Sequence, residues 1–337
     1  MKHKLKFAVA GALTGALALT ACSSSGASSD DQLSLVGYSV LEAANKPIIS
    51  DFQETDAGDG VVFKESYGAS GDQSRAVEND LDADVVHFSL ETDVTRLVDV
   101  GLVDKDWKSG PTKGIATSSV VVFVVRKGNP KNIQTWDDLV KPGVEIITPN
   151  PGSSGSARWN ILAGWAHATK GKEDDAAGKA YVTKFLNNVI ALPGSGREAT
   201  TAFTGGNGDV LMSYENEAIL ARQQGEDVDY VVPDDTLLIE NPATVTSDAA
   251  PAAQDFLDYM LSKDAQLDYA KSGFRPVIDG VTTDVEGAND PSDPFPEPKT
   301  LYTIDDNFGG WDAAAAKFFD EESGIIPELQ QKTGQTG

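Results

Sequence analysis

Three short segments rich in glycine and serine have the composition of an anion site built from main-chain groups. They are 66–71 (Ser-Tyr-Gly-Ala-Ser-Gly), 152–156 (Gly-Ser-Ser-Gly-Ser) and 193–197 (Pro-Gly-Ser-Gly-Arg). A helix N-terminus carries unpaired N–H groups and a partial positive charge, and glycine lets an anion approach that backbone closely. Serine hydroxyls add further donors. The pattern predicts a small-oxyanion site without lysine or arginine in contact, although each segment alone also fits an ordinary turn and helix cap.

The elements around these segments must bring them together. Apolar, strand-like runs lie at 33–38, 61–63, 83–88, 120–125, 144–148, 189–192 and 209–214, and most are followed by helical patterns. Each glycine–serine segment follows such a run and precedes a helical pattern. This alternation predicts an α/β fold with mainly parallel sheets flanked by helices. Further on, the sequence predicts a helix pair at 249–272, an extended linker at 279–299 and a last helix at 312–319.

The charge balance and the scarcity of metal ligands exclude several classes of function. The chain has 337 residues, with 27 Lys and Arg against 52 Asp and Glu, and a formal net charge of −25. No basic cluster lies beyond the first six residues, which argues against nucleic acid or an anionic membrane surface as a partner. Because there are one cysteine and three histidines, we expect no disulfide, no metal site and no cofactor.

The N-terminus has the pattern of an export signal that ends at a lipid attachment point. Residues 1–21 join three lysines to an apolar run of about 13 residues, which is too short to span a bilayer. Leu-Thr-Ala precedes Cys22, as in a bacterial lipoprotein signal. We therefore expect cleavage after residue 21, lipid on Cys22, a flexible tether over 22–31 and anchoring on the outer face of the cytoplasmic membrane. The alternative is an ordinary cleavage site with a free or buried cysteine.

Enzymatic interpretations have less support. The segment 152–156 superficially resembles a nucleophile elbow, but Ser156 occupies the last glycine position. His87 and His167 are the only histidines beyond the signal, and no Gly-x-x-x-x-Gly-Lys phosphate loop occurs. We expect a binding protein without catalytic residues. A surface hydrolase of sulfate or phosphate esters is the alternative from another class, and a surface structural or sensing protein is a third.

Longer motifs add a family resemblance. They are Ser-Tyr-Gly-Ala-Ser-Gly-Asp-Gln at 66–73, Val-Val-Arg-Lys-Gly-Asn-Pro at 124–130, Trp-Asp-Asp-Leu-Val-Lys-Pro-Gly-Val at 136–144, Ile-Thr-Pro-Asn-Pro at 147–151, Ala-Arg-Trp-Asn at 157–160, Gly-Asp-Val-Leu at 208–211, Glu-Asn-Glu-Ala at 215–218, Phe-Arg-Pro at 274–276 and Thr-Ile-Asp-Asp-Asn-Phe-Gly-Gly-Trp at 303–311. From about Leu33 to Trp311 the chain resembles the sulfate-binding proteins of bacterial sulfate/thiosulfate ABC importers. The resemblance implies a two-lobed periplasmic-binding-protein-like fold of type 2 topology, with the ligand in the interlobe cleft.

The resemblance also implies how the chain is divided and what it meets. We expect lobe 1 from 32–116 and 219–278, lobe 2 from 117–218, and the C-terminal part, 279–337, packed back on lobe 2. The expected protein is a monomer that captures sulfate or thiosulfate for sulfur assimilation and delivers it to the membrane permease of an importer.

Residue by residue, the resemblance places ligand contacts at the three glycine–serine segments. The backbone N–H groups of Ser70, Gly155, Ser156 and Gly196 and the hydroxyl of Ser154 would donate to the anion. In addition, Asp93 and Arg197 match a family pair that braces the cleft across the lobes.

Two positions at the edge of the expected site depart from the family. A tryptophan that contacts the anion is replaced by Tyr214, and an aspartate after the first strand is replaced by Ser39. A phenol reaches differently from an indole and can accept as well as donate a hydrogen bond. Thiosulfate, molybdate, phosphate or another tetrahedral oxyanion therefore remains an alternative to sulfate.

Overall fold

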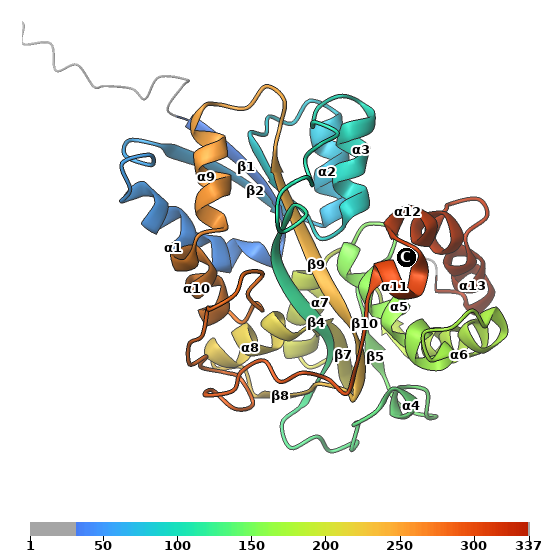
Figure 1. Cartoon of the computed structure of the whole chain (residues 1–337). Helices are drawn as coiled ribbons and strands as arrows, with labels where there is room; N and C mark the ends of the chain where they lie inside the picture. Colours follow the sequence, from blue (N-terminus) through green and yellow to red (C-terminus); the bar gives the residue numbers. More distant parts are fainter. Residues whose placement is uncertain (1–31, 336–337) are drawn as a thin grey trace, which may run out of the picture.

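The computed structural model describes residues 32–335 (Figure 1). Its strands are β1 (Gln32–Tyr38), β2 (Val62–Gly68), β3 (Val85–His87), β4 (Ile115–Arg126), β5 (Ile146–Ile147), β6 (Val189–Ala191), β7 (Val210–Tyr214), β8 (Val228–Val231), β9 (Asp235–Val245) and β10 (Thr300–Tyr302). Its helices are α1 (Leu41–Gln53), α2 (Ser70–Glu78), α3 (Glu91–Asp99), α4 (Trp136–Leu139), α5 (Gly155–Thr169), α6 (Asp175–Asn188), α7 (Gly196–Thr204), α8 (Glu215–Gln223), α9 (Ala252–Met260), α10 (Lys263–Lys271), α11 (Ile304–Phe308), α12 (Trp311–Ala314) and α13 (Ile325–Thr333), with a π-helical turn, η2 (Ala315–Phe319), after α12.

The first lobe is built on the parallel strands β2, β1 and β3, with the end of β9 antiparallel beside β3. Because the side chains of a strand point alternately to opposite faces, β1 contributes to two cores. Leu33 and Leu35 pack in a cluster with residues of α1, α9 and α10, whereas Val36 packs in another with residues of α2 and α3. Figure 1 shows these two helix groups on opposite sides of the sheet.

The second lobe is built on the parallel strands β7, β5 and β6, with β4 antiparallel to β7 and to β8. β4 is buried along nearly its whole length, as its valine-rich sequence predicts. Its alternate residues again serve two cores. Val121 and Phe123 pack with residues of α5 and α6, and Val122 and Val124 pack with residues of α7 and α8.

Two long strands connect the lobes. β4 pairs with β9 from Ile115 to Val120 and then continues to pair with β7 and β8. β9 continues in the opposite direction until Ala243–Val245 pair with β3. The chain therefore crosses between the lobes more than once, and the predicted two-lobed α/β fold is confirmed.

One expected lobe boundary differs from this arrangement. α8 packs against β4 and β8 pairs with β4, so the residues just after 219 lie in the second lobe rather than the first. The reason is that the second crossing takes place within β9, at 235–245. The C-terminal part contacts both lobes, because β10 pairs with β9, α13 packs against α6 and α12 contacts α3.

The expected export signal, the tether and Cys22 lie outside the described residues. Between residues 32 and 335, none of the helices has the length and apolar character needed to span a membrane.

Candidate functional site

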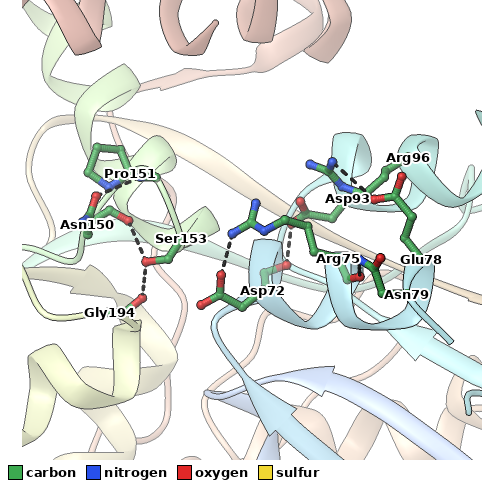
Figure 2. Close-up of polar contacts among 12 residues, drawn as sticks. Asp72, Arg75, Glu78, Asn79, Asp93, Arg96, Asn150, Pro151, Ser153 and Gly194 are labelled. Atoms are coloured by element: carbon green, nitrogen blue, oxygen red, sulfur yellow. Dashed lines mark hydrogen bonds and ion pairs between the residues drawn. The ribbon is translucent and has the colours of Figure 1, made fainter. Parts of the chain in front are cut away.

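The three glycine–serine segments meet where the two lobes touch, at the N-terminal ends of α2, α5 and α7. The Gly71 N–H donates to the Ser153 carbonyl oxygen at 3.1 Å, which joins the first segment to the second across the lobes. The Ser153 hydroxyl donates to the Gly194 carbonyl oxygen at 2.7 Å, which joins the second to the third (Figure 2). A Cβ atom placed on Gly196 would lie 3.5 Å from Ser156 Cβ. The predicted convergence of the three segments is therefore present.

The first residues of these helices present unpaired N–H groups. Helix geometry leaves the first N–H groups without an intrahelical acceptor, and none within residues 32–335 reaches those of Ser70, Gly155, Ser156 and Gly196. All four residues are buried. We call these four residues the amide cradle. A buried N–H without an acceptor is costly, so this arrangement favours a guest that only accepts hydrogen bonds.

The serine hydroxyls around the amide cradle fall into two groups. Ser154 and Ser156 are buried, and their hydroxyls have no hydrogen-bond partner among the described residues. That of Ser70 is already engaged, because it donates to Asp93 Oδ2 at 2.6 Å and accepts from the Ser89 N–H at 2.9 Å. The free hydroxyls can therefore turn toward a guest, whereas the Ser70 hydroxyl fixes the start of α2.

Ser39, which the sequence places at the edge of the expected site, lies at the turn between β1 and α1. Its N–H donates to the Gly68 carbonyl oxygen at 2.7 Å, and the residue is half-buried. The neighbouring Val40 lies against the third segment, since a Cβ atom on Gly196 would be 3.3 Å from Val40 Cγ2. Ser39 is thus near the amide cradle, with its backbone donor already used.

Ser89, which follows β3, is a site residue that sequence reasoning missed. Its carbonyl oxygen accepts from Trp159 Nε1 at 3.0 Å and from Asn241 Nδ2 at 3.1 Å, and its hydroxyl shares a 2.7 Å hydrogen bond with Tyr214 Oη. A Cβ atom placed on Gly155 would lie 2.6 Å from Ser89 Cβ. Ser89 therefore contacts the second lobe at the start of α5. A single serine after an apolar run gives no distinctive signal in the sequence.

Tyr214 lies at the end of β7 beside the amide cradle, and its hydroxyl is held by Ser89. The side chain is fully buried. Burial raises the pKa of the Tyr214 phenol, an effect that the hydrogen bond with Ser89 and the nearby Asn241 side chain partly oppose. The phenol therefore keeps its proton and fixes the Ser89 hydroxyl.

Asp93 and Arg197, expected as a bracing pair, do not contact each other among the described ion pairs. Arg197 Nη2 lies 2.8 Å from Glu217 Oε1 in its own lobe and 3.5 Å from the Val40 carbonyl oxygen of the first lobe. Asp93 instead accepts from Ser70 within the first lobe. Each residue thus steadies one side of the site separately, and only Arg197 reaches across the lobes.

Burial dominates the electrostatics of the carboxylates behind the site. It raises the pKa of Asp93, opposed by the hydrogen bond from Ser70 and by nearby arginines, of which Arg158 contributes most. It also raises the pKa of Glu217, opposed by Arg197 and the hydroxyl of Thr200.

The histidines lie in other environments. His87 Nε2 is 3.2 Å from Thr117 Oγ1, and burial lowers the pKa of its ring to about 3. His167 Nδ1 is 2.8 Å from Asp235 Oδ2. Neither imidazole is therefore paired with a serine hydroxyl of the amide cradle as the general base of a hydrolase would be.

These features define an interlobe binding site of the solute-binding class. A family model described as bacterial extracellular solute-binding protein matches residues 33–275 of the chain. The chain therefore belongs to the bacterial extracellular solute-binding proteins. It is an exported binding protein rather than an enzyme.

Similar proteins narrow the family further. A sulfate-binding protein of Synechococcus elongatus is 38% identical over 320 residues, which cover 92% of this chain and 89% of the relative. The thiosulfate-binding protein of Escherichia coli is 35% identical, with 82% of this chain and 83% of the relative covered. The solved structure of the sulfate-binding protein SubI of Mycobacterium tuberculosis is 47% identical, has a TM-score of 0.80, and covers 86% of this chain and 99% of its own. Within the family, the chain groups with sulfate- and thiosulfate-binding proteins.

Proposed function

We propose that the protein captures sulfate outside the cytoplasmic membrane and delivers it to the permease of an ABC importer. The observation that carries this proposal is the convergence of unpaired, buried N–H groups at the starts of three helices. Helix N-termini attract anions through their free N–H groups and their partial positive charge. The names of the relatives support sulfate as the first candidate.

The chemistry of the donors also favours sulfate over phosphate. Sulfate at neutral pH carries no proton and accepts hydrogen bonds only, which suits a site lined by donors. Hydrogen phosphate carries a proton that would face another donor. An unmet buried polar group costs about 1–3 kcal/mol, which is roughly a 5- to 150-fold preference for sulfate.

Thiosulfate is the second candidate, supported by the E. coli thiosulfate-binding relative. One of its four terminal atoms is sulfur, which is larger than oxygen and a weaker acceptor. We expect the sulfur atom to lie at the edge of the site formed by Tyr214 and Ser89, where the family tryptophan is absent. Molybdate and phosphate are further alternative ligands.

Isothermal titration calorimetry of the mature chain with sulfate, thiosulfate, molybdate and phosphate tests the proposal. We expect one-to-one binding of sulfate and at least fivefold weaker binding of phosphate. Absence of heat with both sulfate and thiosulfate would refute the proposed function. Tighter binding of molybdate than of sulfate would change the assigned ligand.

The proposal includes a lipid anchor on Cys22 and action as a monomer. Cys22→Ala should move the protein from the detergent phase to the aqueous phase of a Triton X-114 extract of the producing cells, because a lipidated chain partitions with the detergent. An unchanged distribution would refute lipidation and leave the sulfate proposal untouched.

A further inference from the structure

A groove next to the amide cradle is lined by three arginines and has no part in the proposed function. It has a volume of about 420 Å³ and lies between α2 and α3 of the first lobe, the loop before α5, and the C-terminal part of the chain. Its lining includes Arg75, Thr92, Arg96, Arg158 and Phe319. We call it the arginine groove, defined by these five residues. Figure 2 shows Arg75 and Arg96 on the two helices that face the loop of Pro151 and Ser153.

Arginines are concentrated in the lining of the arginine groove, in contrast to other cavities of this acidic chain. Its lining holds three arginines against two carboxylates, Asp320 and Glu321. The Asp320 carboxylate already accepts from the Ser323 hydroxyl at 2.7 Å and the Ser323 N–H at 2.8 Å. In four other cavities of the described chain, acidic lining residues outnumber basic ones. The lining of the arginine groove is therefore richer in cationic side chains than the linings of those four cavities, although Asp72 and Glu78 lie beside Arg75 and Arg96.

Two polar atoms of α3 lack a partner at this groove. Arg96 Nε and Thr92 Oγ1 are buried atoms without a hydrogen-bond partner within residues 32–335. Arg96 has only a 3.7 Å ion pair with Glu78, which is too long for a hydrogen bond. Thr92 and Arg96 are four residues apart, so they lie on the same face of α3. Because both atoms are buried, an acceptor in the groove would reach these donors after a small movement of the two side chains.

Arg75 and Arg158 also have guanidinium N–H groups that are not used in the contacts described next. Arg75 contacts Asp72 at 2.5 Å, and its side chain is 40% exposed. Arg158 Nε donates to the Pro151 carbonyl oxygen at 3.0 Å. Burial lowers the pKa of Arg158, opposed by Asp93, and the charges of Arg96 and Arg75 lower it further. The Asp93 carboxylate lies near all three guanidinium groups and offsets part of their mutual repulsion, and an anion in the groove would offset more of it.

The lining of the arginine groove also includes apolar side chains. Phe319 stacks on the Arg158 guanidinium, with 4.9 Å between its ring centroid and Cζ, and Ile326 and Pro327 also line the groove. The volume falls in the range of sites for small organic molecules, about 300–1,000 Å³, and is too large to be filled by one inorganic oxyanion. Guanidinium groups match the oxygens of carboxylate, sulfonate and phosphate groups. The geometry therefore combines a head-group site with a surface for a hydrocarbon body.

We propose that the arginine groove binds a small organic oxyanion, with its charged group at Arg75, Arg96 and Thr92 and its apolar body against Phe319. This site is separate from the amide cradle, since Gly71 and Ser153 close the main chain between them. The protein would then hold two anions of different kinds at one interlobe surface.

Titration of the mature chain with benzenesulfonate tests the proposal, in the absence of sulfate and again in saturating sulfate. We expect one-to-one binding in both conditions, because the amide cradle is not the site. Benzenesulfonamide, which has the same body without the full charge, should bind at least tenfold more weakly. Loss of benzenesulfonate binding in saturating sulfate would assign the binding to the amide cradle and overturn the proposal.

Substitutions in the lining test whether benzenesulfonate binds in the arginine groove. The double variant Arg75→Gln/Arg96→Gln should bind benzenesulfonate at least tenfold more weakly and sulfate as the unchanged chain does, which also reports correct folding. Thr92→Val should weaken benzenesulfonate binding severalfold and is a milder change should the double variant fail to fold. Arg222→Gln is the matched control, because Arg222 stacks on Tyr230 and bonds Asn289 elsewhere.

Absence of saturable binding, or binding that Thr92→Val and the double variant leave unchanged, would refute the arginine groove as a ligand site. The benzenesulfonate titration without sulfate does not depend on sulfate binding. A failure of sulfate to bind would therefore count against the proposed function only.

Discussion

Proline at the first residue of α7 removes one donor of the amide cradle and leaves the helix intact. Gly196 is that first residue, and its N–H has no acceptor within residues 32–335. Proline is favoured at this helix position because the missing N–H has no intrahelical partner. The preceding Ser195 has φ −140° and ψ 166°, the extended conformation that a following proline requires.

The size of the effect follows from the lost hydrogen bond. A hydrogen bond to a charged group contributes about 1.5–3 kcal/mol, so Gly196→Pro should weaken sulfate binding roughly 10- to 150-fold. A new Cβ would lie 3.3 Å from Cγ2 of Val40, a tight contact that requires Val40 to shift by a few tenths of an ångström in the proline and alanine variants alike. Calorimetric titration with sulfate measures the affinity, and urea denaturation without sulfate measures stability, which we expect to change by less than about 1 kcal/mol.

Gly196→Ala is the matched control. Alanine adds the same Cβ atom and keeps the N–H, so its affinity for sulfate should stay within about threefold of the unchanged chain. Equal affinities of the proline and alanine variants would show that this N–H does not bind the anion. A loss shared by both variants would attribute the effect to the Cβ atom.

Two further changes probe the surroundings of the site, and a third probes an ion pair elsewhere in the chain. Gly155→Ala places a Cβ 2.6 Å from Ser89 Cβ across the lobes, so overpacking of about 1–3 kcal/mol should weaken sulfate binding roughly 5- to 150-fold by calorimetry; wild-type affinity would contradict the close contact. Tyr214→Phe leaves the Ser89 hydroxyl without its partner and should lower the free energy of unfolding by about 1–3 kcal/mol in urea; a smaller loss is expected in a Ser89→Ala background, and equal losses would refute the pairing. Burial lowers the pKa of His167, but the hydrogen bond and charge of Asp235 outweigh it and raise that pKa above the ordinary 6.5. The protonated pair therefore stabilises fully below that value and its contribution fades as the pH rises through the folded pKa, so His167→Gln should cost more stability in urea near pH 5.5 than near pH 9, and a pH-independent cost would contradict the ion pair.

The parts of the fold that the sequence predicts are those set by local pattern. β4 is recognisable because it is a continuous valine-rich run, and the cradle segments because each joins a strand to a helix through small residues. The alternation of strands and helices alone does not identify the two-lobed fold, because it fits several α/β architectures. The family motifs are needed to choose among them.

β9 was missed because its sequence carries conflicting local signals. Asn241 and Pro242 read as a turn, yet they lie within the strand, where the register of β4 against β9 shifts between Ile115 and Thr117. Successive parts of β9 pair with β10, β4 and β3, so no single sheet imposes one alternating pattern. The misplaced boundary at 219 follows from this omission.

Within the site, the sequence predicts the segments whose main-chain N–H groups meet but not the side chains that hold them. Ser89 contributes through contacts with residues far away in the chain, which a single sequence does not reveal. For the same reason Asp93 and Arg197 were expected as a pair, although the structure gives each a different partner.

Because the amide cradle is made of peptide groups, it is shielded from most coding changes. Every amino acid except proline retains the N–H, so ordinary substitutions cannot delete these donors. Altered selectivity must instead arise from neighbours that reshape the rim, such as the Tyr214–Ser89 contact. The surface charge can therefore change during evolution without loss of the anion-binding N–H groups. A protein can become as acidic as this chain, with a net charge of −25, and still bind an anion at these groups.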